Sequence, residues 1–235
     1  MQYGQIDKVL PDIAKNHSKY IVMVGNNMDA DVSARILTSS ETVKDIAFGF
    51  QATGGRRENG KVISVHAGVG MTIGGLHAPL SEQFRDHIKE AFSGVCYCLT
   101  WEENMDAWLK CHLAFILPVA YICYATDFNL PKSTNHQRNM AIDAAVEGYT
   151  ILKSLGYPIR PAGSDTYLIH KRGQIKALLW FMAKTPLGRL AASDHCRNAG
   201  TEMILLDTAF ENLRKKADMP TPNWDTLRSR GKPHL

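Results

Sequence analysis

The sequence predicts an α/β fold over residues 1–100, followed by an all-α part over residues 101–235. Three observations lead to this fold class. Helical and strand-like segments alternate at the start of the chain, which is typical of a parallel α/β sheet. Short strand-like segments come next, and after residue 100 only helical periodicity remains. A chain of 235 residues has room for two such domains.

The start of the chain sets out the α/β order. Residues 3–17 place apolar side chains on one helical face, and residues 20–24 (Tyr-Ile-Val-Met-Val) form the short β-branched run of a buried strand. Residues 25–27 (Gly-Asn-Asn) end this strand, and residues 28–37 are again helical in pattern. Because the order begins on a helix with no strand before it, we expect the sheet to lack its first strands.

The later segments change character at residue 100. Strands are predicted at residues 43–53, 61–67, 71–76 and 95–100, with a turn at 54–60 and a helix at 79–92. Helices are predicted at residues 102–125, 135–155, 173–184 and 198–217, the first of them kinked or broken at Pro118. The tail after Met219 is expected to be docked or frayed.

Composition excludes several classes of protein. The hydrophobic fraction of 45% and charged fraction of 21% are those of an ordinary globular protein, and the net charge of +4 is too small to indicate nucleic-acid binding. The five cysteines form no C-x-x-C pair, and neither they nor the histidines have the spacing of a metal site. The apolar run 113–125 contains Pro118 and is too short to span a bilayer, so we expect a buried helix. With no secretory signal at the start, we expect reduced thiols and a cytoplasmic protein without membrane partners.

The main glycine cluster does not fit a dinucleotide site. Residues 68–75 read Gly-Val-Gly-Met-Thr-Ile-Gly-Gly, which departs by one position from G-x-G-x-x-G. The cluster lies between two strand-like segments, whereas a dinucleotide turn follows a strand and opens a helix. We therefore interpret it as a turn that joins strands.

Several short stretches carry a family resemblance. They are residues 21–29 (Ile-Val-Met-Val-Gly-Asn-Asn-Met-Asp), Trp108-Leu-Lys110, residues 147–158, residues 200–204 (Gly-Thr-Glu-Met-Ile) and residues 218–222 (Asp-Met-Pro-Thr-Pro). In this order, the sequence resembles the ketopantoate reductase (2-dehydropantoate 2-reductase) family along essentially its whole length. The resemblance implies a Rossmann-like domain, here N-terminally truncated and without its glycine-rich front. A helical domain of the 6-phosphogluconate-dehydrogenase-like type is then expected to follow.

The resemblance also implies a chemistry, the NADPH-dependent reduction of a 2-keto acid to a 2-hydroxy acid, as in pantothenate biosynthesis. Lys110 would be the catalytic cation and proton donor, Glu202 would bind the hydroxyl or orient the lysine, and Asn26 would contact NADP(H). Each residue also has a structural interpretation. Lys110 could lie at the edge of a buried helix, Glu202 could be a carboxylate at a helix N-terminus, and Asn26 could be a turn former.

Some positions depart from the family pattern. Where the family often has asparagine, four and eight residues after the lysine, this chain has Ala114 and Pro118. A family serine aligns with Leu190, although Ser193 and Asp194 are close enough for a small shift to restore a polar contact. We therefore expect a small 2-keto acid that is more apolar than ketopantoate.

Two functions remain open from the sequence. The first is an oxidoreductase whose nucleotide-binding front is supplied by a segment outside this chain. The second is a non-enzymatic remnant that serves as a helical dimerisation or small-ligand-binding domain. A homodimer could form through the apolar segment 115–124, which could equally be an intrachain core. Residues 1–25 would lack the strands that normally flank them, so we expect the open apolar edge to be covered by a partner chain or to make the protein poorly behaved in solution.

Overall fold

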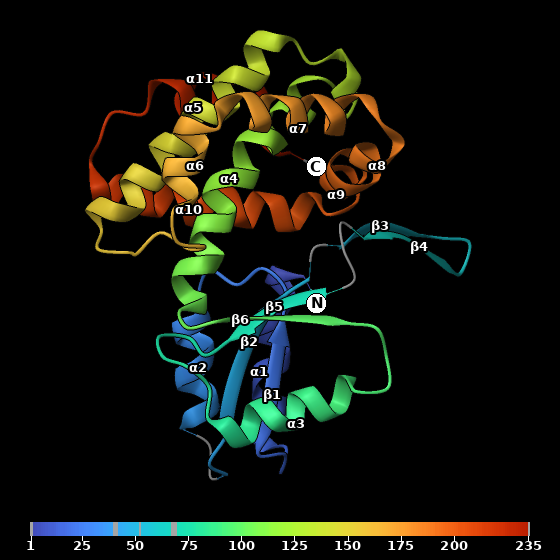
Figure 1. Cartoon of the computed structure of the whole chain (residues 1–235), viewed down its shortest axis with the longest axis vertical. Coiled ribbons are helices and arrows are strands. Elements are labelled where there is room, and N and C mark those ends of the chain that lie inside the picture. Colours follow the sequence, from blue (N-terminus) through green and yellow to red (C-terminus); the bar gives the residue numbers. More distant parts are fainter. Residues whose placement is uncertain (1, 40–41, 52, 67–69, 235) are drawn as a thin grey trace. The chain divides into compact units, whose positions relative to one another are not determined.

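The computed structural model describes residues 2–39, 42–51, 53–66 and 70–234, which form two compact units (Figure 1). Unit 1 comprises residues 1–52 and 67–109, and unit 2 comprises residues 53–66 and 110–235. A β-hairpin inserted within the first part of the sequence thus belongs to the second unit.

Unit 1 is built on a mixed four-stranded sheet. Its elements are a 3₁₀ turn (Tyr3–Gln5), α1 (Ile6–Lys15), β1 (Tyr20–Val24), α2 (Ala30–Thr38), β2 (Asp45–Phe50), β5 (Gly70–Gly74), α3 (Glu82–Phe92), β6 (Cys98–Glu102) and the start of α4 (Met105–Ala125). The strand order is β1-β2-β5-β6. The pairs β1–β2 and β5–β6 are parallel, whereas β2–β5 is antiparallel. The predicted α/β order is confirmed, and the sheet is mixed rather than fully parallel.

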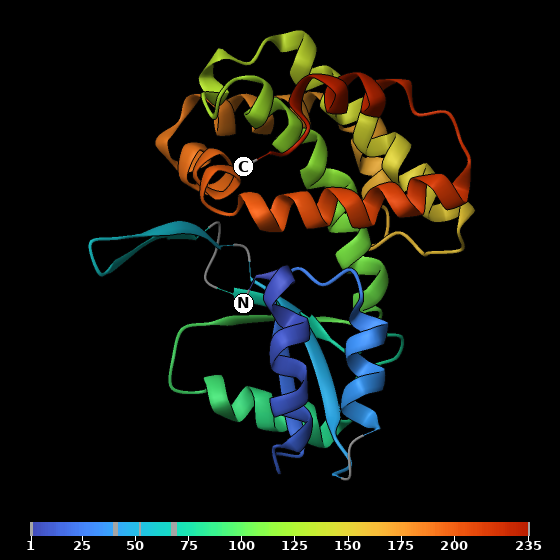
Figure 2. The same ribbon diagram turned by 180° about the vertical axis from the view of Figure 1, so that it is seen from behind.

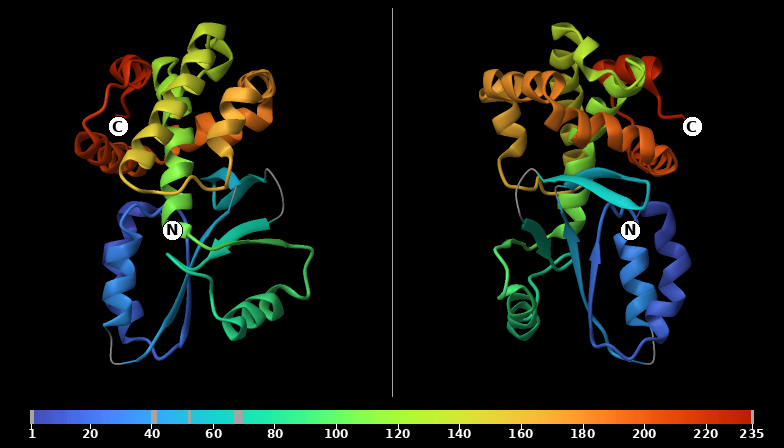
Figure 3. Two further views of the ribbon diagram at one scale, coloured as in Figure 1. Left: turned by 60° about the vertical axis from the view of Figure 1, so that its left-hand side comes forward. Right: turned by 90° about the vertical axis from the view of Figure 1, so that its right-hand side faces the viewer.

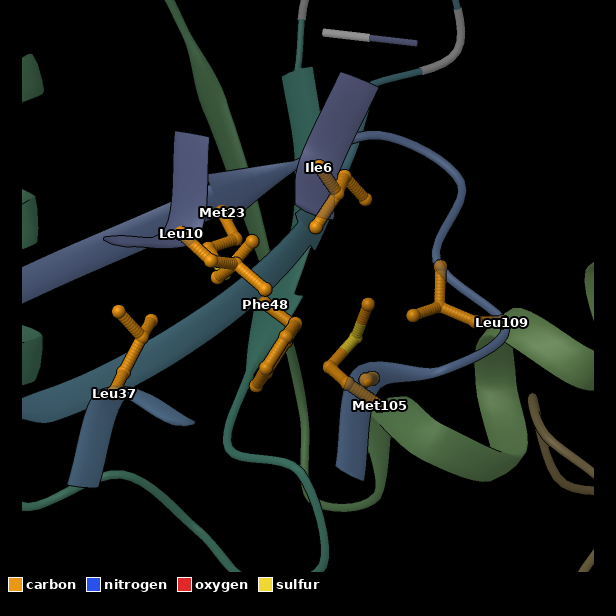
Figure 4. Packing of buried hydrophobic residues seen from close by; sticks show 8 residues of the cluster. Ile6, Leu10, Met23, Leu37, Phe48, Met105 and Leu109 are labelled. Atoms are coloured by element: carbon orange, nitrogen blue, oxygen red, sulfur yellow. The ribbon is translucent and has the colours of Figure 1, made fainter. Parts of the chain in front are cut away.

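Helices cover both faces of this sheet. Neighbouring residues of β2 point to opposite sides, so that Phe48 packs with α1 and α2 while Ala47 packs with α3. Figure 2 shows α1 and α2 side by side, and the left view of Figure 3 shows α3 on the other face. The larger cluster also takes in Met105 and Leu109 from the start of α4 (Figure 4). The first turns of α4 are therefore part of the core of unit 1.

Three predicted boundaries in this region are wrong. Residues 54–60 are not one turn, because β3 (Thr53–Glu58) and β4 (Lys61–His66) form an antiparallel hairpin around Asn59 and Gly60. Both turn residues have positive φ, as a type I′ hairpin turn requires. The glycines that precede them have low strand propensity, so the sequence pattern did not indicate this strand. Helix α3 begins at Glu82 rather than residue 79, because the Ser81 hydroxyl accepts the Phe84 N–H as its N-cap. The last strand runs over residues 98–102 instead of 95–100.

Unit 2 is a bundle of helices that also includes the β3–β4 hairpin. After α4 come a 3₁₀ turn (Leu130–Lys132), α5 (Asn135–Ser154), α6 (Ser164–His170), α7 (Arg172–Lys184), α8 (Pro186–Gly188), a π-helical turn (Arg189–Ser193), α9 (Asp194–Asn198), α10 (Gly200–Ala217) and α11 (Pro222–Gly231). Helix α5 packs against α6, α7, α10 and α11, and β3 packs against the π-helical turn and α9. Pro118 does not break α4, which is continuous to Ala125.

Helix α4 is a core helix of the bundle. Its length and composition would allow it to cross a membrane, but 78% of its most apolar window is buried within the protein. Leu117, Tyr121 and Tyr124 are all buried, so the segment 115–124 belongs to the intrachain core. The tail after Met219 is docked rather than frayed, because Trp224 of α11 is fully buried and stacks on Phe210 at a centroid distance of 4.7 Å.

Candidate active site

Lys110 lies in a closed environment within unit 2. Its side chain is on α4, and the residue is only 4% exposed. The Lys110 Nζ sits over the ring of Tyr157, 4.9 Å from the centroid, which places a cation against the electron-rich face of an aromatic ring. The simple interpretation of a lysine that extends into water from a helix edge is therefore excluded, since the ammonium is buried.

The segment after α5 places Tyr157 over the lysine. Gly156 has φ of 86°, a left-handed conformation that ends α5 and lets the chain turn back. The Cys111 thiol, next to the lysine on α4, then accepts a hydrogen bond from the Arg160 N–H at 3.4 Å and donates to the Pro158 carbonyl at 3.8 Å. The buried Cys111 thiol thus holds the turn after α5 in place through two hydrogen bonds.

Glu202 is also buried in unit 2, close to a pair of histidines. It belongs to the first turn of α10 and is 5% exposed. His195 of α9 places its Nε2 3.9 Å from a Glu202 carboxylate oxygen. Burial, and then the charge of His195, lower the pKa of His112 on α4 to about 4. His112 is therefore neutral at neutral pH, and the three side chains form a polar group inside a largely apolar bundle.

In unit 1, Asn26 lies just after β1, where the chain turns. Gly25 has φ of 137°, and its N–H donates to the Gly49 carbonyl at 2.9 Å. Asn27 is the turn former: its side-chain oxygen accepts the Asp29 N–H at 3.0 Å, and its amide donates to Ser33 Oγ at 3.1 Å. The Asn26 side-chain oxygen is buried and receives no hydrogen bond from the described residues. Buried acceptors are usually hydrogen-bonded, so this oxygen is available to a donor from a water molecule or a ligand.

The positions that depart from the family pattern face the core. Ala114 is fully buried on α4, and a side chain added at Gly148 of α5 would come within 3.0 Å of it. Pro118 is buried as well. Ser193, the last residue of the π-helical turn, is 1% exposed and has its Oγ 4.0 Å from the Cys123 sulfur. The side chain of Leu190 lies outside the described side chains.

The glycine cluster has a structural explanation in its described part. Gly70 and Gly74 are the first and last residues of β5, which confirms that the cluster does not open a helix. A Cβ at Gly74 would lie 1.7 Å from the Glu102 carbonyl oxygen, and one at Gly70 would lie 2.5 Å from that of Cys98. These glycines allow β5 and β6 to approach closely.

Among the residues that the structure describes, one set of potential metal ligands occurs, and it lies in unit 1. Ligand atoms of Asp31, His77 and Asp106 lie within 4.8 Å of one another. His77 Nε2 and Asp31 Oδ1 are already hydrogen-bonded at 2.6 Å, and both residues are exposed, as many surface pairs are. The absence of a metal centre, expected from the sequence, stays a prediction.

Comparison with known proteins places the fold. No protein-family model and no curated protein matches the chain in sequence. In three dimensions it is similar to D-mandelate dehydrogenase in a ternary structure with NADH and anilino(oxo)acetate, with a TM-score of 0.65 and 14% identity over 98% of this chain and 72% of that one. A PanE/ApbA family ketopantoate reductase from Ralstonia eutropha JMP134 gives a TM-score of 0.64 and 12% identity over 97% and 72% of the two chains. The chain has the ketopantoate reductase fold.

The ketopantoate reductase fold is also that of a dimeric enzyme from Staphylococcus aureus, with a TM-score of 0.59 and 11% identity over 90% of this chain and 75% of that one.

Within this fold, the sequence singled out Lys110 and Glu202 but missed their neighbours Tyr157, His195 and His112. Of these three residues, only Tyr157 could have been found from the sequence, because it lies in the Gly-Tyr-Pro turn of the stretch 147–158 that resembles the family.

Proposed function

We propose that this chain is the substrate-binding and proton-donating part of a nicotinamide-dependent reductase that converts a 2-keto acid into a 2-hydroxy acid. The observation that carries the proposal is the buried Lys110 ammonium, held against Tyr157. A buried ammonium is suited to stabilise the negative charge that develops on a carbonyl oxygen during reduction. Support also comes from the fold, since a neighbour with this fold holds NADH and a keto-acid analogue, anilino(oxo)acetate.

The proposed step uses Lys110 as cation and acid. Reduced nicotinamide, when bound, supplies the hydride that adds to the carbonyl carbon. As negative charge develops on the carbonyl oxygen, the Lys110 ammonium stabilises it and donates a proton from Nζ, which forms the hydroxyl group. Lys110 then regains a proton from water. Glu202, buried and fixed at the first turn of α10, accepts a hydrogen bond from the substrate or orients the lysine.

Among the described residues, the proposed contact to the cofactor, NADP(H), is Asn26. Asn26 would accept a hydrogen bond from it through the buried oxygen described above, at the end of a strand where α/β sheets bind ligands. Within the described part of the glycine cluster we identify no comparable site for the diphosphate, because Gly70 and Gly74 serve the packing of β5 against β6. The proposal therefore includes a glycine-rich phosphate-binding turn supplied by polypeptide outside these 235 residues.

The substrate is proposed to be a small 2-keto acid with an apolar body. Ala114 and Pro118 pack in the core and offer no side-chain hydrogen bond to a substrate hydroxyl. We also propose that the protein works as a homodimer, as the S. aureus reductase does.

The experiment measures substrate-side binding apart from the cofactor. Calorimetry with anilino(oxo)acetate and with ketopantoate compares the wild-type chain, Lys110→Met and Glu202→Gln, with exposed Lys132→Met as the matched control. Loss of a charge-assisted contact should weaken binding at least tenfold in the first two variants and leave the control unchanged. NADPH fluorescence should show weak binding by the chain alone.

Two results would overturn parts of the proposal. Keto-acid binding that is unaffected by Lys110→Met would remove the lysine from the site and favour a non-enzymatic ligand-binding domain. Tight NADPH binding by these residues would show that no outside turn is needed. In a form that holds the cofactor, Lys110→Met should lower kcat by about 10²-fold or more, and a loss below tenfold would exclude the acid role.

A further inference from the structure

The turn that follows α5, residues 156–160, is fixed at its start by backbone hydrogen bonds. The Tyr157 N–H donates to the Leu152 carbonyl at 2.9 Å. The Gly156 N–H donates to the Lys153 carbonyl at 3.0 Å. These two bonds form a Schellman motif, in which the left-handed Gly156 ends the helix. The backbone of Tyr157 is therefore part of the helix cap and has a defined position.

The same turn is fixed at its end by α4. The Cys111 thiol accepts the Arg160 N–H at 3.4 Å and donates to the Pro158 carbonyl at 3.8 Å. Lys110 precedes Cys111 on α4, and its Nζ lies over the Tyr157 ring. Two adjacent residues of α4 thus contact one turn, one through a thiol and the other through an ammonium group. The aromatic ring is therefore held in place beside the lysine.

We propose that Tyr157 is a positioning residue of the candidate site and that the face of its ring fixes the Lys110 ammonium group. The inference rests on the proposed function, since it concerns the same lysine. It extends that function to a residue outside the three that the family resemblance singles out. The proposed role is exerted through Lys110 and requires no contact between Tyr157 and the substrate.

A flexible side chain needs a partner of this kind. Lysine carries its charge at the end of a flexible four-carbon stem, and Lys110 is only 4% exposed, so little water contacts it. Proton transfer requires the donor to lie within hydrogen-bonding distance of the carbonyl oxygen. A displacement of about 1 Å can lower a rate by about 100-fold. A ring face that holds Nζ in one place would prevent this loss.

The ring face has a chemical advantage over a carboxylate in this role. Its quadrupole attracts the ammonium group, and the attraction is strongest where the cation is removed from water. Unlike a carboxylate, the ring takes up no proton, so the lysine remains a donor for a substrate oxygen. The phenol hydroxyl lies in the plane of the ring, whereas Nζ lies over its face. Phenylalanine should therefore be able to replace Tyr157, and leucine should not.

The first measurement locates the ammonium group. The chain is labelled with ¹³C-lysine, and the Lys110 Cε signal is assigned in the ¹H–¹³C spectrum by its loss in Lys110→Met. Protons over a ring face are shifted upfield by the ring current, so we expect an upfield Lys110 Hε signal in the wild type and in Tyr157→Phe. In Tyr157→Leu the signal should return to the range of the exposed lysines. Tyr167→Leu, at an exposed tyrosine on α6, is the matched control.

The second measurement asks whether Tyr157 acts through Lys110. Calorimetry with anilino(oxo)acetate should show binding that is weaker by about fivefold or more in Tyr157→Leu and unchanged in Tyr157→Phe and Tyr167→Leu. In the Lys110→Met background, Tyr157→Leu should have no further effect, because the ring then has no cation to hold. Urea unfolding verifies that each variant is folded. A merely structural role would weaken binding by a similar factor in both backgrounds and would overturn the inference.

Three other results would also overturn it. Equal losses of binding in Tyr157→Phe and Tyr157→Leu would assign the role to the hydroxyl group. An unshifted Lys110 signal in the wild type would show that the ring does not hold the ammonium group. Binding that is unaffected by Tyr157→Leu but lost in Lys110→Met would remove Tyr157 from the site and leave the proposed function standing. Binding that is unaffected by Lys110→Met would overturn both proposals, because it removes the lysine itself.

Discussion

His112 should make the stability of this protein depend on pH in a window set by its environment. Burial, and secondly the charge of His195, hold the pKa of His112 at about 4, against 6.5 for the free side chain. The folded state therefore favours neutral His112, and the unfolded state binds more protons between these two values. Stability is full above about pH 6.5 and is lost as pH falls toward 4. The loss at about pH 4.5 should be on the order of 2–3 kcal/mol relative to pH 7.

The assay is urea unfolding of wild type and His112→Gln at about pH 7, 5.5 and 4.5. Glutamine does not titrate, so the difference in unfolding free energy between the two proteins isolates this histidine from the carboxylates that also titrate. The wild type should lose on the order of 2–3 kcal/mol against the variant over this range. Substitution of the exposed His136 by Gln, on α5, controls for the change of residue. A difference that does not vary with pH would refute the buried neutral imidazole.

Two further changes test the packing that fixes the bundle. Gly148→Ala would place a Cβ 3.0 Å from Ala114, so we expect a loss of about 1–3 kcal/mol in urea unfolding, and an unchanged midpoint would contradict the close approach of α4 and α5. Asp207→Ala removes a buried carboxylate that accepts hydrogen bonds from Arg228 at 2.9 and 2.7 Å, which should cost about 3–5 kcal/mol. A loss below 1 kcal/mol would show that the ion pair is not a structural anchor.

Local chemistry explains which elements the sequence could predict. The β-branched run at residues 20–24 has one reasonable structure, and it forms β1. Helix α5 follows a capping box at Thr134 and ends before Gly156, so both of its ends are encoded locally. The hairpin was missed because Gly54 and Gly55 lack strand propensity, and their pairing with Val65 and Ser64 comes from the opposite strand.

The candidate site is also only partly predictable from the sequence. Lys110 and Glu202 can be found from short motifs, because each lies within a continuous stretch of sequence that resembles the family. Tyr157 reaches the lysine through a left-handed glycine and a thiol anchor, and His195 reaches Glu202 from a separate short helix. Such neighbours depend on how helices pack, and no local pattern encodes them.

At Ala114 and Pro118 this chain departs from the family pattern, and the structure shows that both residues pack in the core. On α4 these positions are used for packing, with Ala114 against Gly148 and Trp224 nearby, so a polar side chain there would be buried among helices. The groups next to Lys110 and Glu202 come instead from Tyr157 and His195. Without hydrogen-bonding side chains at these two positions of α4, we expect the proposed substrate to be recognised by its carboxylate and keto groups. This agrees with the apolar 2-keto acid that we propose, because neither Ala114 nor Pro118 offers a side-chain hydrogen bond to a further polar group.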